Sequence, residues 1–327
     1  MKVSVVMPVY NTRRDLLERA IGSVLSQTEQ SFELIVVDDG SNQETAAALD
    51  EIAARDTRIA VYHQQNQGGG GFPARYDGIA KAIGEYVYVP DSDDVLHPRL
   101  LEYCLWAAEN KGVEFLAFRF TKIHDGASID IPDLQDFNNT PLFVVDGTSN
   151  AESFKAALPL VHVDNWAQFA TRELMQSLPP RKVSDLTRTF RLIKGARRWA
   201  ATPLQLYFYD TGISESVTHK KYALEQITCL HKDLLELCNL YEEERKKKEP
   251  TWEMIFRVFV AGSLKIAYNA IRKRDLLLGK PQYEKAFAEM LLDIFRQQGN
   301  RLTWVKMRLR FTYFIALLKM KCLWNKK

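Results

Sequence analysis

Two clusters of acidic residues are the part of the sequence best suited to chemistry. One is the Asp-Asp pair at positions 38–39, directly after an apolar run, and the other is Asp-Ser-Asp-Asp at positions 91–94, after another apolar run. Carboxylates at alternate positions, such as Asp91 and Asp93, can bind one hard cation together, and such oxygen ligands suit Mg²⁺ or Mn²⁺ bridging to a substrate diphosphate. A single acidic turn more often caps a helix. Two such turns at strand ends favour a metal-assisted site.

The elements that must position these clusters follow from hydrophobic periodicity. The first 120 residues alternate short apolar runs with segments whose apolar residues recur every three or four positions. This alternation predicts an α/β fold with a Rossmann-like, mostly parallel sheet and helices on both faces. Ligands bind at the carboxyl ends of such strands, where both acidic clusters lie. The predicted strands are 3–9, 32–37, 59–63, 86–89 and 115–120, and the predicted helices are 13–27, 43–55, 74–84 and 98–110.

The pattern changes after residue 120. Residues 124–150 are rich in Asp, Asn, Gly and Pro and predict an irregular segment before a helix that begins at Ala151. A helix over 184–194 and a strand over 204–209 follow, and from about residue 220 the sequence predicts only helices. We therefore expect an α/β domain over 1–224 and a C-terminal all-helical region. That region covers 225–327, with helices near 220–245, 251–274, 281–298 and 301–323.

Composition excludes several classes of protein. The chain has 327 residues, 46% of them hydrophobic, which is enough for a core without disulfides or metal. Its four cysteines form no metal-binding or disulfide pattern. No apolar stretch approaches the roughly 20 residues of a membrane-spanning helix, and the N-terminus reads as a strand rather than a signal peptide. We therefore expect a cytoplasmic protein.

Charge is distributed unevenly along the chain. Lys and Arg exceed Asp and Glu by three overall, but residues 1–224 are net negative, and after Asp293 there are nine basic residues and no acidic one. Residues 296–327 fit two structures: a basic amphipathic helix on the inner face of the cell membrane, or a core-packing helix with a solvated basic face. A homo-oligomer formed through the C-terminal helices is compatible with both. Nucleic acid is not an expected partner, because the acidic N-terminal domain repels phosphate.

Motifs in the first 100 residues resemble those of family 2 glycosyltransferases. They are Val-Val-Met-Pro-Val-Tyr-Asn at 5–11, the apolar strand with Asp-Asp-Gly-Ser at 32–41, Asn-Gln-Gly at 66–68, Ala-Arg at 74–75 and Asp-Ser-Asp-Asp at 91–94, in the order typical of that family. The resemblance is dense over residues 1–100 and sparse over 160–218, and none is found beyond about 224. It implies a GT-A fold, a nucleotide-sugar donor, usually a UDP-sugar, and inverting transfer to a hydroxyl of a cell-surface glycan or lipid-linked acceptor.

The resemblance also implies roles for individual residues. Residues 1–120 would bind the nucleotide-sugar, and residues 121–224 would form the acceptor side and supply the catalytic base. Asp93, together with Asp91, would hold Mn²⁺ or Mg²⁺ as a DxD motif, which would neutralise the charge of the diphosphate leaving group. The residues implied to contact the nucleotide-sugar are Pro8, Val9, Tyr10, Asp39, Arg75, Asp91 and Ser92.

The sequence departs from the family at two positions that matter for the site. Family members have Ala-Arg-Asn where this chain has Ala-Arg-Tyr at 74–76, after four consecutive glycines. An inverting transferase needs one general base, which the family often places as the Asp of a Glu-Asp pair that opens a helix. Here Ser184 replaces the Glu, and Asp185 is the candidate base, with Asp164 in reserve. A first-turn Asp that only stabilises the helix dipole is the alternative for Asp185.

Other functions remain open at this stage. Gly68–Gly71 does not follow the first strand and lacks G-x-G-x-x-G, which argues against a dinucleotide-binding dehydrogenase. A nucleotidyltransferase would need a basic phosphate-gripping loop, for which residues 10–14 are a faint match. A non-catalytic nucleotide-sugar or glycan-binding protein would be favoured if Asp185 lay far from the acidic turn. His219 is either a ligand of the diphosphate or metal, or a structural residue. The aromatic residues Trp166, Trp199, Tyr207 and Tyr209 are interpreted as core rather than as a sugar-stacking surface.

Overall fold

The computed structural model describes most of the N-terminal two thirds of the chain. The described residues are 1–68, 71–124, 131, 133–149, 151–179 and 185–212, with 228, 231–232, 234–237, 239 and 289. The chain divides into two compact units, Met1–Thr218 and His219–Lys327. Residues 234–237 are helical, but the other helices predicted beyond 220 lie almost wholly outside the described residues. Among the described helices, none is both long and apolar enough to span a membrane.

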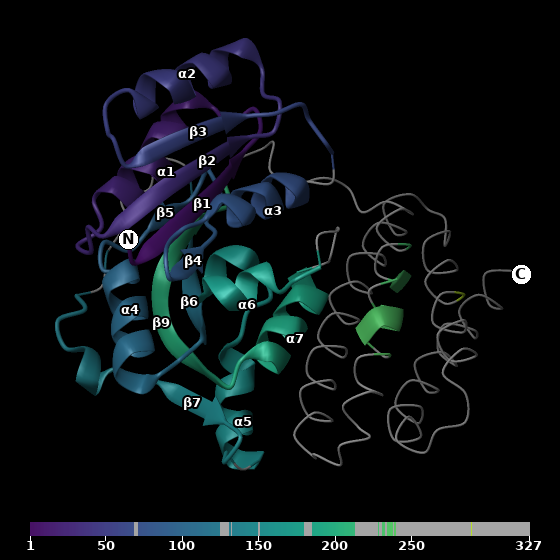
Figure 1. The fold of residues 1–327 in the computed structure, drawn as a ribbon. Coiled ribbons are helices and arrows are strands. Elements are labelled where there is room, and N and C mark those ends of the chain that lie inside the picture. The colour runs from purple at the N-terminus through teal and green to yellow at the C-terminus, as the bar shows by residue number, and fades with distance from the viewer. Residues whose placement is uncertain are drawn as a thin grey trace, which may run out of the picture. The chain divides into compact units, whose positions relative to one another are not determined.

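The first half of the sheet is parallel, as the sequence predicts. Strands pair in the order β3-β2-β1-β4, with Val9 of β1 opposite Asp38 of β2. All seven residues of β1 are buried, as expected for a strand that helices cover on both faces. The strands are β1 (Val3–Val9), β2 (Phe32–Asp38), β3 (Ile59–His63) and β4 (Tyr86–Tyr88), and the helices between them are α1 (Arg14–Leu25), α2 (Gln43–Ala53) and α3 (Phe72–Lys81) (Figure 1).

Different helices cover the two faces of this parallel half. Val5 and Met7 of β1 belong to the same core cluster as the buried residues of α1 and α2. Successive strand residues point to opposite faces, so Val6 points the other way, toward α3. There Gly78 of α3 packs so closely that a Cβ atom on it would lie 2.3 Å from Val6 Cγ1. The close fit brings α3, which carries Arg75, directly against β1 and β2.

The second half of the sheet is largely antiparallel. β4 pairs antiparallel with β8, β8 antiparallel with β6, and β6 parallel with β9, so that the described sheet has nine strands of mixed direction. The long strand β9 curves past the end of β4 and pairs with β5 and β7 (Figure 1). The elements are β5 (Val95–Leu96), α4 (Leu100–Lys111), β6 (Phe115–Ile123), β7 (Phe143–Asp146), α5 (Ala151–Ala157), β8 (Gln168–Thr171), α6 (Arg172–Gln176), α7 (Asp185–Gly195) and β9 (Arg198–Asp210), with 3₁₀ turns at Phe137–Asn139, Leu158–Leu160 and Asn165–Ala167.

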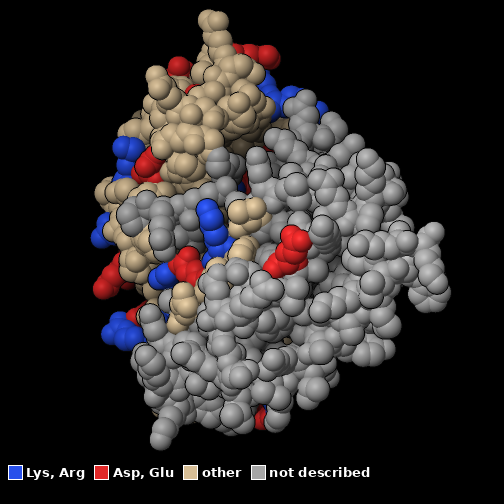
Figure 2. Space-filling model, turned by 90° about the vertical axis from the view of Figure 1, so that its right-hand side faces the viewer, with Lys and Arg blue, Asp and Glu red and all other residues tan. Residues whose placement is uncertain are grey.

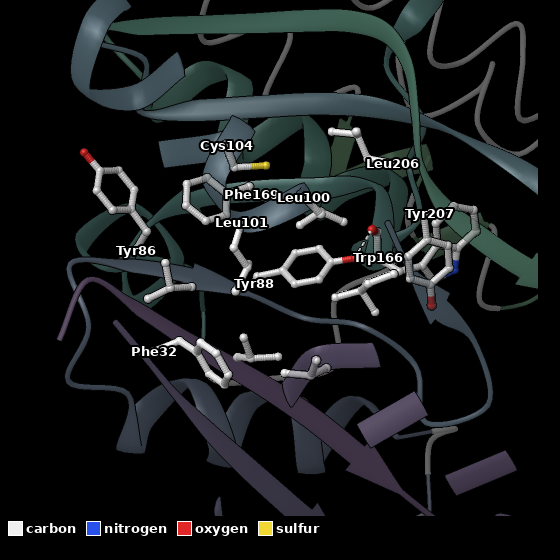
Figure 3. Packing of buried hydrophobic residues seen from close by; sticks show 14 of the residues in the cluster. Phe32, Tyr86, Tyr88, Leu100, Leu101, Cys104, Trp166, Phe169, Leu206 and Tyr207 are labelled. Carbon is white, nitrogen blue, oxygen red and sulfur yellow. Dashed lines mark hydrogen bonds between the residues drawn. The ribbon is translucent and has the colours of Figure 1, made fainter. Parts of the chain in front are cut away.

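The core joins the two halves through aromatic side chains. Tyr88 of β4 donates its hydroxyl hydrogen to the carbonyl of Trp166 at 2.9 Å (Figure 3). The Trp166 ring stacks on Tyr207 of β9, with centroids 4.7 Å apart and planes 6° from parallel. Trp166, Trp199 and Tyr207 are almost completely buried, which confirms the interpretation of these aromatics as core residues. Tyr209 is only half-buried.

The structure adds elements to the regions where the sequence predicted least. The segment 124–150 contains β7 and a 3₁₀ turn. The strand predicted over 204–209 begins earlier, at Arg198, because the preceding residues pair with both β6 and β7. On the face drawn in Figure 2, the described part of the chain has basic and acidic side chains interspersed. The positive excess of residues 296–327, with its membrane and oligomer hypotheses, lies outside the described residues.

Candidate active site

The acidic turn at 91–94 connects β4 to β5 and is held in place by β9. Asp94 is completely buried: Tyr207 donates its hydroxyl hydrogen to Asp94 Oδ2 at 2.6 Å, and the backbone N–H of Asp210 donates to Oδ1 at 2.7 Å. The same Tyr207 oxygen accepts a hydrogen bond from the Asp91 backbone N–H at 3.2 Å. Asp94 therefore fixes the turn onto β9, and both of its oxygens are already engaged in doing so.

Asp93 lies in an environment crowded with negative charge. Burial, Asp91 and Asp210 raise the pKa of Asp93 to about 6. Arg19 of α1 opposes this only in part, because its Nη2 atom donates to the Asp93 carbonyl at 2.8 Å and to Asp210 Oδ2 at 2.6 Å. A cation beside Asp93 and Asp91 would relieve the repulsion between these carboxylates.

The donor set at this turn suits a divalent ion that is shared with a substrate. Among the described residues, no three His, Cys, Asp or Glu side chains converge to hold a metal ion by themselves. Asp91 and Asp93 would supply two hard oxygen donors, which leaves coordination positions for diphosphate oxygens. The residues present therefore fit Mn²⁺ or Mg²⁺.

Arg75 of α3 contacts the acidic turn directly. Its Nη2 atom donates to Asp91 Oδ1 at 2.7 Å, and its side chain is only 16% exposed. Burial alone would lower the pKa of Arg75, but Asp91 and Asp185 outweigh it and raise that pKa. Arg75 is therefore a permanent cation that interacts with a carboxylate of the acidic turn and with the candidate base.

Asp185 is the first residue of α7, and its carboxylate lies within this electrostatic neighbourhood. Its Oδ1 atom accepts a hydrogen bond from Asn165 Nδ2 and lies 3.9 Å from Arg188 Nε. Burial raises the pKa of Asp185, Arg188 and Arg75 lower it, and Asp164 and Asp91 raise it. The structure thus brings Asp185 together with Arg75 and Asp91, although they come from three separate segments of the chain.

The reserve candidate, Asp164, is engaged elsewhere. Its Oδ2 atom lies 2.7 Å from His162 Nδ1, and its side chain is 36% exposed. Ser184 and His219 lie outside the described residues, so the Ser-for-Glu departure and the role of His219 stay as predictions.

The residues predicted to line the nucleotide gather at the ends of β1 and β2. Pro8 and Val9 are buried at the end of β1, and the next residue, Tyr10, is 55% exposed. Asp39 is 2% exposed, and its Oδ1 atom accepts from Gln64 Nε2 at 3.0 Å and from the Gln67 N–H at 3.2 Å. Asp39 is thus held in place by the segment that follows β3.

Ser92 joins the acidic turn to the loop that follows the nucleotide strip, our name for the predicted nucleotide-lining residues Pro8, Val9, Tyr10 and Asp39 at the ends of β1 and β2. Its hydroxyl lies 2.6 Å from Thr12 Oγ1, in the loop between β1 and α1. Ser92 is 7% exposed, so in this structure its hydroxyl joins two parts of the site. Sequence reasoning missed the residues that hold these parts together, namely Thr12, Arg19, Tyr207 and Asp210. No sequence motif identifies these residues, although Asp210 could have been noticed because it directly follows a predicted strand.

Comparisons with known proteins show which proteins this chain resembles in sequence. A family model described as "Glycosyl transferase family 2" matches residues 4–193, from β1 to α7. Among curated proteins, the chain is 38% identical over 112 residues to "Glycosyltransferase GlyG" of Streptococcus pneumoniae, which is 34% of this chain and 36% of that protein. It is 36% identical over 115 residues to a "Poly(ribitol-phosphate) beta-glucosyltransferase" of Bacillus spizizenii, which is 34% of this chain and 18% of that protein. These matches span about a third or less of each relative.

Solved structures resemble the chain over a longer stretch. Residues 1–349 of TarS from S. aureus, in complex with UDP-GlcNAc, match with a TM-score of 0.67 and 17% identity, covering 90% of this chain and 80% of that one. At this identity the likeness shows the fold alone. It confirms the predicted GT-A fold, a sheet with flanking helices.

Proposed function

Because the chain belongs to glycosyl transferase family 2, we propose that it transfers a sugar from a UDP-sugar to a hydroxyl group, with inversion at the anomeric carbon. The acceptor is a cell-surface glycan or a lipid-linked glycan. Two comparisons support this reading: the TarS fragment was solved with UDP-GlcNAc, and one relative is described as acting on poly(ribitol-phosphate). The observation that carries the proposal is that Arg75 interacts with both Asp91 of the acidic turn and Asp185.

The chain's own residues divide the work of the transfer. Pro8, Val9 and Tyr10 would line the nucleotide, and Asp39 would accept a hydrogen bond from the uracil ring. Asp91 and Asp93 would hold the divalent ion, which offsets the charge of the departing diphosphate when it is bound. Arg75 lies beside Asp91 and adds a second positive charge at that position.

Asp185 would act as the general base. It would accept the proton of the acceptor hydroxyl as the oxygen attacks the anomeric carbon. Burial raises its pKa, and a base is most effective when its pKa lies closer to the working pH. A non-catalytic role would be favoured by an Asp185 far from the acidic turn, whereas Asp185 and Asp91 here interact with the same arginine.

The nucleotidyltransferase alternative has less support. It needs basic side chains at residues 10–14 that face a phosphate. Arg13 pairs with Asp15 at 2.6 Å, and Arg14 pairs with Glu18 at 3.0 Å and with Glu51 at 2.6 Å. These pairings bind both arginines to acidic side chains around α1 and α2.

The proposal is tested by calorimetric titration with UDP, in the presence and absence of Mn²⁺. We expect Mn²⁺-dependent binding by the intact protein, and its loss or strong weakening in Asp93→Asn, which removes one ionic ligand without changing the side-chain shape. Asp133→Asn is the matched control, because Asp133 is exposed and lies outside the site. Equal binding by both variants would reject Asp93 as a metal ligand, and no binding of UDP by the intact protein would reject the UDP-sugar donor.

A further inference from the structure

A buried arginine next to the candidate base has no role in the function proposed so far. Arg188 lies on α7, three residues after Asp185, and its side chain is 7% exposed. Its Nε and Nη1 atoms make no hydrogen bond with any part of the chain that the structure describes. Burial lowers the pKa of Arg188 to about 10, so it is a cation at neutral pH. A buried, incompletely bonded guanidinium is costly to maintain, so its presence calls for a compensating role.

The protein holds this guanidinium in one place. Arg188 Nη2 donates to Gln168 Oε1 at 2.8 Å. The amide nitrogen of Gln168 in turn donates to the His162 carbonyl at 2.6 Å and to Thr189 Oγ1 at 2.7 Å. Because the Gln168 amide nitrogen is occupied by two acceptors, its oxygen must face Arg188. The fully buried Gln168 therefore leaves the rest of the guanidinium on the side of Asp185, whose Oδ1 atom is 3.9 Å from Nε.

Charges of both signs act on Asp185 from four segments of the chain. Arg188 and Arg75 face it as cations from α7 and α3, and Asp164 and Asp91 face it as anions from the segment before the 3₁₀ turn Asn165–Ala167 and from the acidic turn. Arg75 is also bonded to Asp91. Among the residues that the structure describes, Asp185 is the only acidic side chain that forms an ion pair with Arg188. Arg75 therefore divides its charge between Asp91 and Asp185, whereas Arg188 pairs with Asp185.

We propose that Arg188 is a positioning residue that keeps the Asp185 carboxylate ionised and oriented while Arg75 serves the acidic turn. The inference rests on the proposed function, in which Asp185 is the general base. A partly desolvated base close to other acids would otherwise take up a proton from solvent and lose its function near neutral pH. The cation lowers the pKa of Asp185 by direct electrostatic attraction, and an opposite charge at such a distance shifts a carboxyl pKa by about one unit or more.

The experiment measures the pKa of Asp185 directly. Protein labelled with ¹³C at the aspartate carboxyl carbons is titrated by NMR, and the Asp185 signal is identified by its absence in Asp185→Asn. In Arg188→Met and Arg188→Gln, which are both neutral, we expect this pKa to rise by about one unit or more. Arg188→Lys keeps the charge and should hold the pKa near that of the intact protein. Arg55→Met is the matched control, since Arg55 is exposed after the end of α2.

A second readout follows the chemistry. The rate of UDP release from UDP-GlcNAc with Mn²⁺, with water as acceptor, is measured against pH. A base must be deprotonated, so the rate falls as the pH drops through its pKa, and a raised pKa moves this acidic limb to higher pH. We expect the limb to move in both neutral variants, with the rate largely recovered at high pH. The use of two neutral variants allows for one of them failing to fold.

The outcomes separate this inference from the proposed function. If Asp185→Asn releases UDP at the rate of the intact protein, Asp185 is not the base and the proposed function loses that assignment. If Asp185→Asn is inactive but the neutral Arg188 variants leave the pKa of Asp185 unchanged, only the role of Arg188 is overturned. A shift in Arg188→Lys as large as in the neutral variants would also overturn it, because packing rather than charge would then be responsible.

Discussion

In the parallel half of the sheet, Asp39 and the acidic turn closely follow the ends of strands, whereas in the antiparallel half the candidate base is the first residue of a helix. Asp39 follows β2, and its backbone N–H donates to the Val9 carbonyl at the end of β1. Asp185, by contrast, begins α7 and is bonded to Asn165, twenty residues earlier. The position of Asp39 therefore follows from the order of the strands. The position of Asp185 depends on the packing of α7 against the Asn165–Ala167 turn.

The difference matters for how the two halves would carry out a transfer. The parallel half presents the acidic turn and the nucleotide strip at one edge, which is where α/β sheets bind ligands. The antiparallel half adds two charged side chains, the partly exposed Asp185 and the buried Arg188, which are brought together only when β8, α7 and the Asn165–Ala167 turn pack together. Variants in the two halves should therefore differ: changes in the parallel half should affect donor binding, and changes around α7 should affect the chemical step.

The largest effect is expected from removing the candidate base. Asp185→Asn keeps the shape of the side chain but cannot accept a proton. It should lower the rate of sugar transfer by roughly a hundred- to ten-thousand-fold, while calorimetry shows UDP binding with Mn²⁺ close to that of the intact protein. Loss of UDP binding in this variant would break the separation between the two halves.

The matched control for that variant is Asp164→Asn. Asp164 lies near Asp185 but pairs with His162. A small change in rate is expected. A loss in Asp164→Asn that exceeds the loss in Asp185→Asn would transfer the role of base to Asp164.

The fold could be predicted where local pattern and packing agree. β1, β3, α2 and α7 begin and end within two residues of their predicted bounds. β5 and β8 were not predicted, because strands of two and four residues carry too little pattern and are determined by their pairing with β9, β4 and β6. The mixed direction of the sheet has the same origin, since an antiparallel strand is inserted between two predicted strands.

The candidate site was predictable to a similar extent. Motifs identified Asp91, Asp93, Arg75 and Asp185 as candidate site residues. Tyr207 and Arg19 contact the acidic turn from 116 and 74 residues away, and spacing in the sequence contains no signal for such contacts. Arg188 was not predicted either, although the i, i+3 spacing of Asp185 and Arg188 on a predicted helix is a signal that could have identified it.

A smaller effect is expected from the packing of α3 in the parallel half. Gly78→Ala places a methyl group 2.3 Å from Val6 Cγ1 and 3.1 Å from Val37 Cγ2. We expect a loss of about 1–3 kcal/mol in the free energy of unfolding, measured by urea denaturation. Gly22→Ala in α1 is the control, because nothing lies within 4 Å of that site, and it should stabilise the protein by up to about 1 kcal/mol. Equal changes in the free energy of unfolding in the two variants would show that helix propensity, and not the close contact of Gly78 with Val6, determines the effect.

Removal of the Tyr207 hydroxyl should test the link between the halves. In Tyr207→Phe, buried Asp94 loses a donor and the Asp91 N–H loses an acceptor. The expected cost is about 1–2 kcal/mol in the free energy of unfolding, because buried polar groups are left without partners. Tyr62→Phe is the control, at a side chain 40% exposed. If both variants were equally stable, the acidic turn would be held by its other contacts alone.

The smallest effect is expected at His63, a contact confined to the parallel half. Its Nδ1 atom lies 2.7 Å from Asp38 Oδ2 and its Nε2 atom 3.1 Å from Asp50 Oδ1. Hydrogen bonds to Asp38 first and Asp50 second raise the pKa of His63. The stabilisation is therefore complete below the pKa of the unfolded chain and is lost as the pH rises through the raised folded-state pKa.

Urea denaturation of the intact protein and of His63→Asn, at pH 5.5 and pH 8.5, measures this contribution. Because His63 is 42% exposed, solvent screens the pair, and the difference at the lower pH should be only about 0.2–1 kcal/mol. It should shrink at the higher pH, and Asp50→Asn should reduce the pH dependence. A stability difference that grows with pH would mean that neutral His63 is the better partner of Asp38. A charge on His63 would then not be needed to stabilise the end of β2, and the pairing of β2 with β3 would hold Asp38 in position by itself.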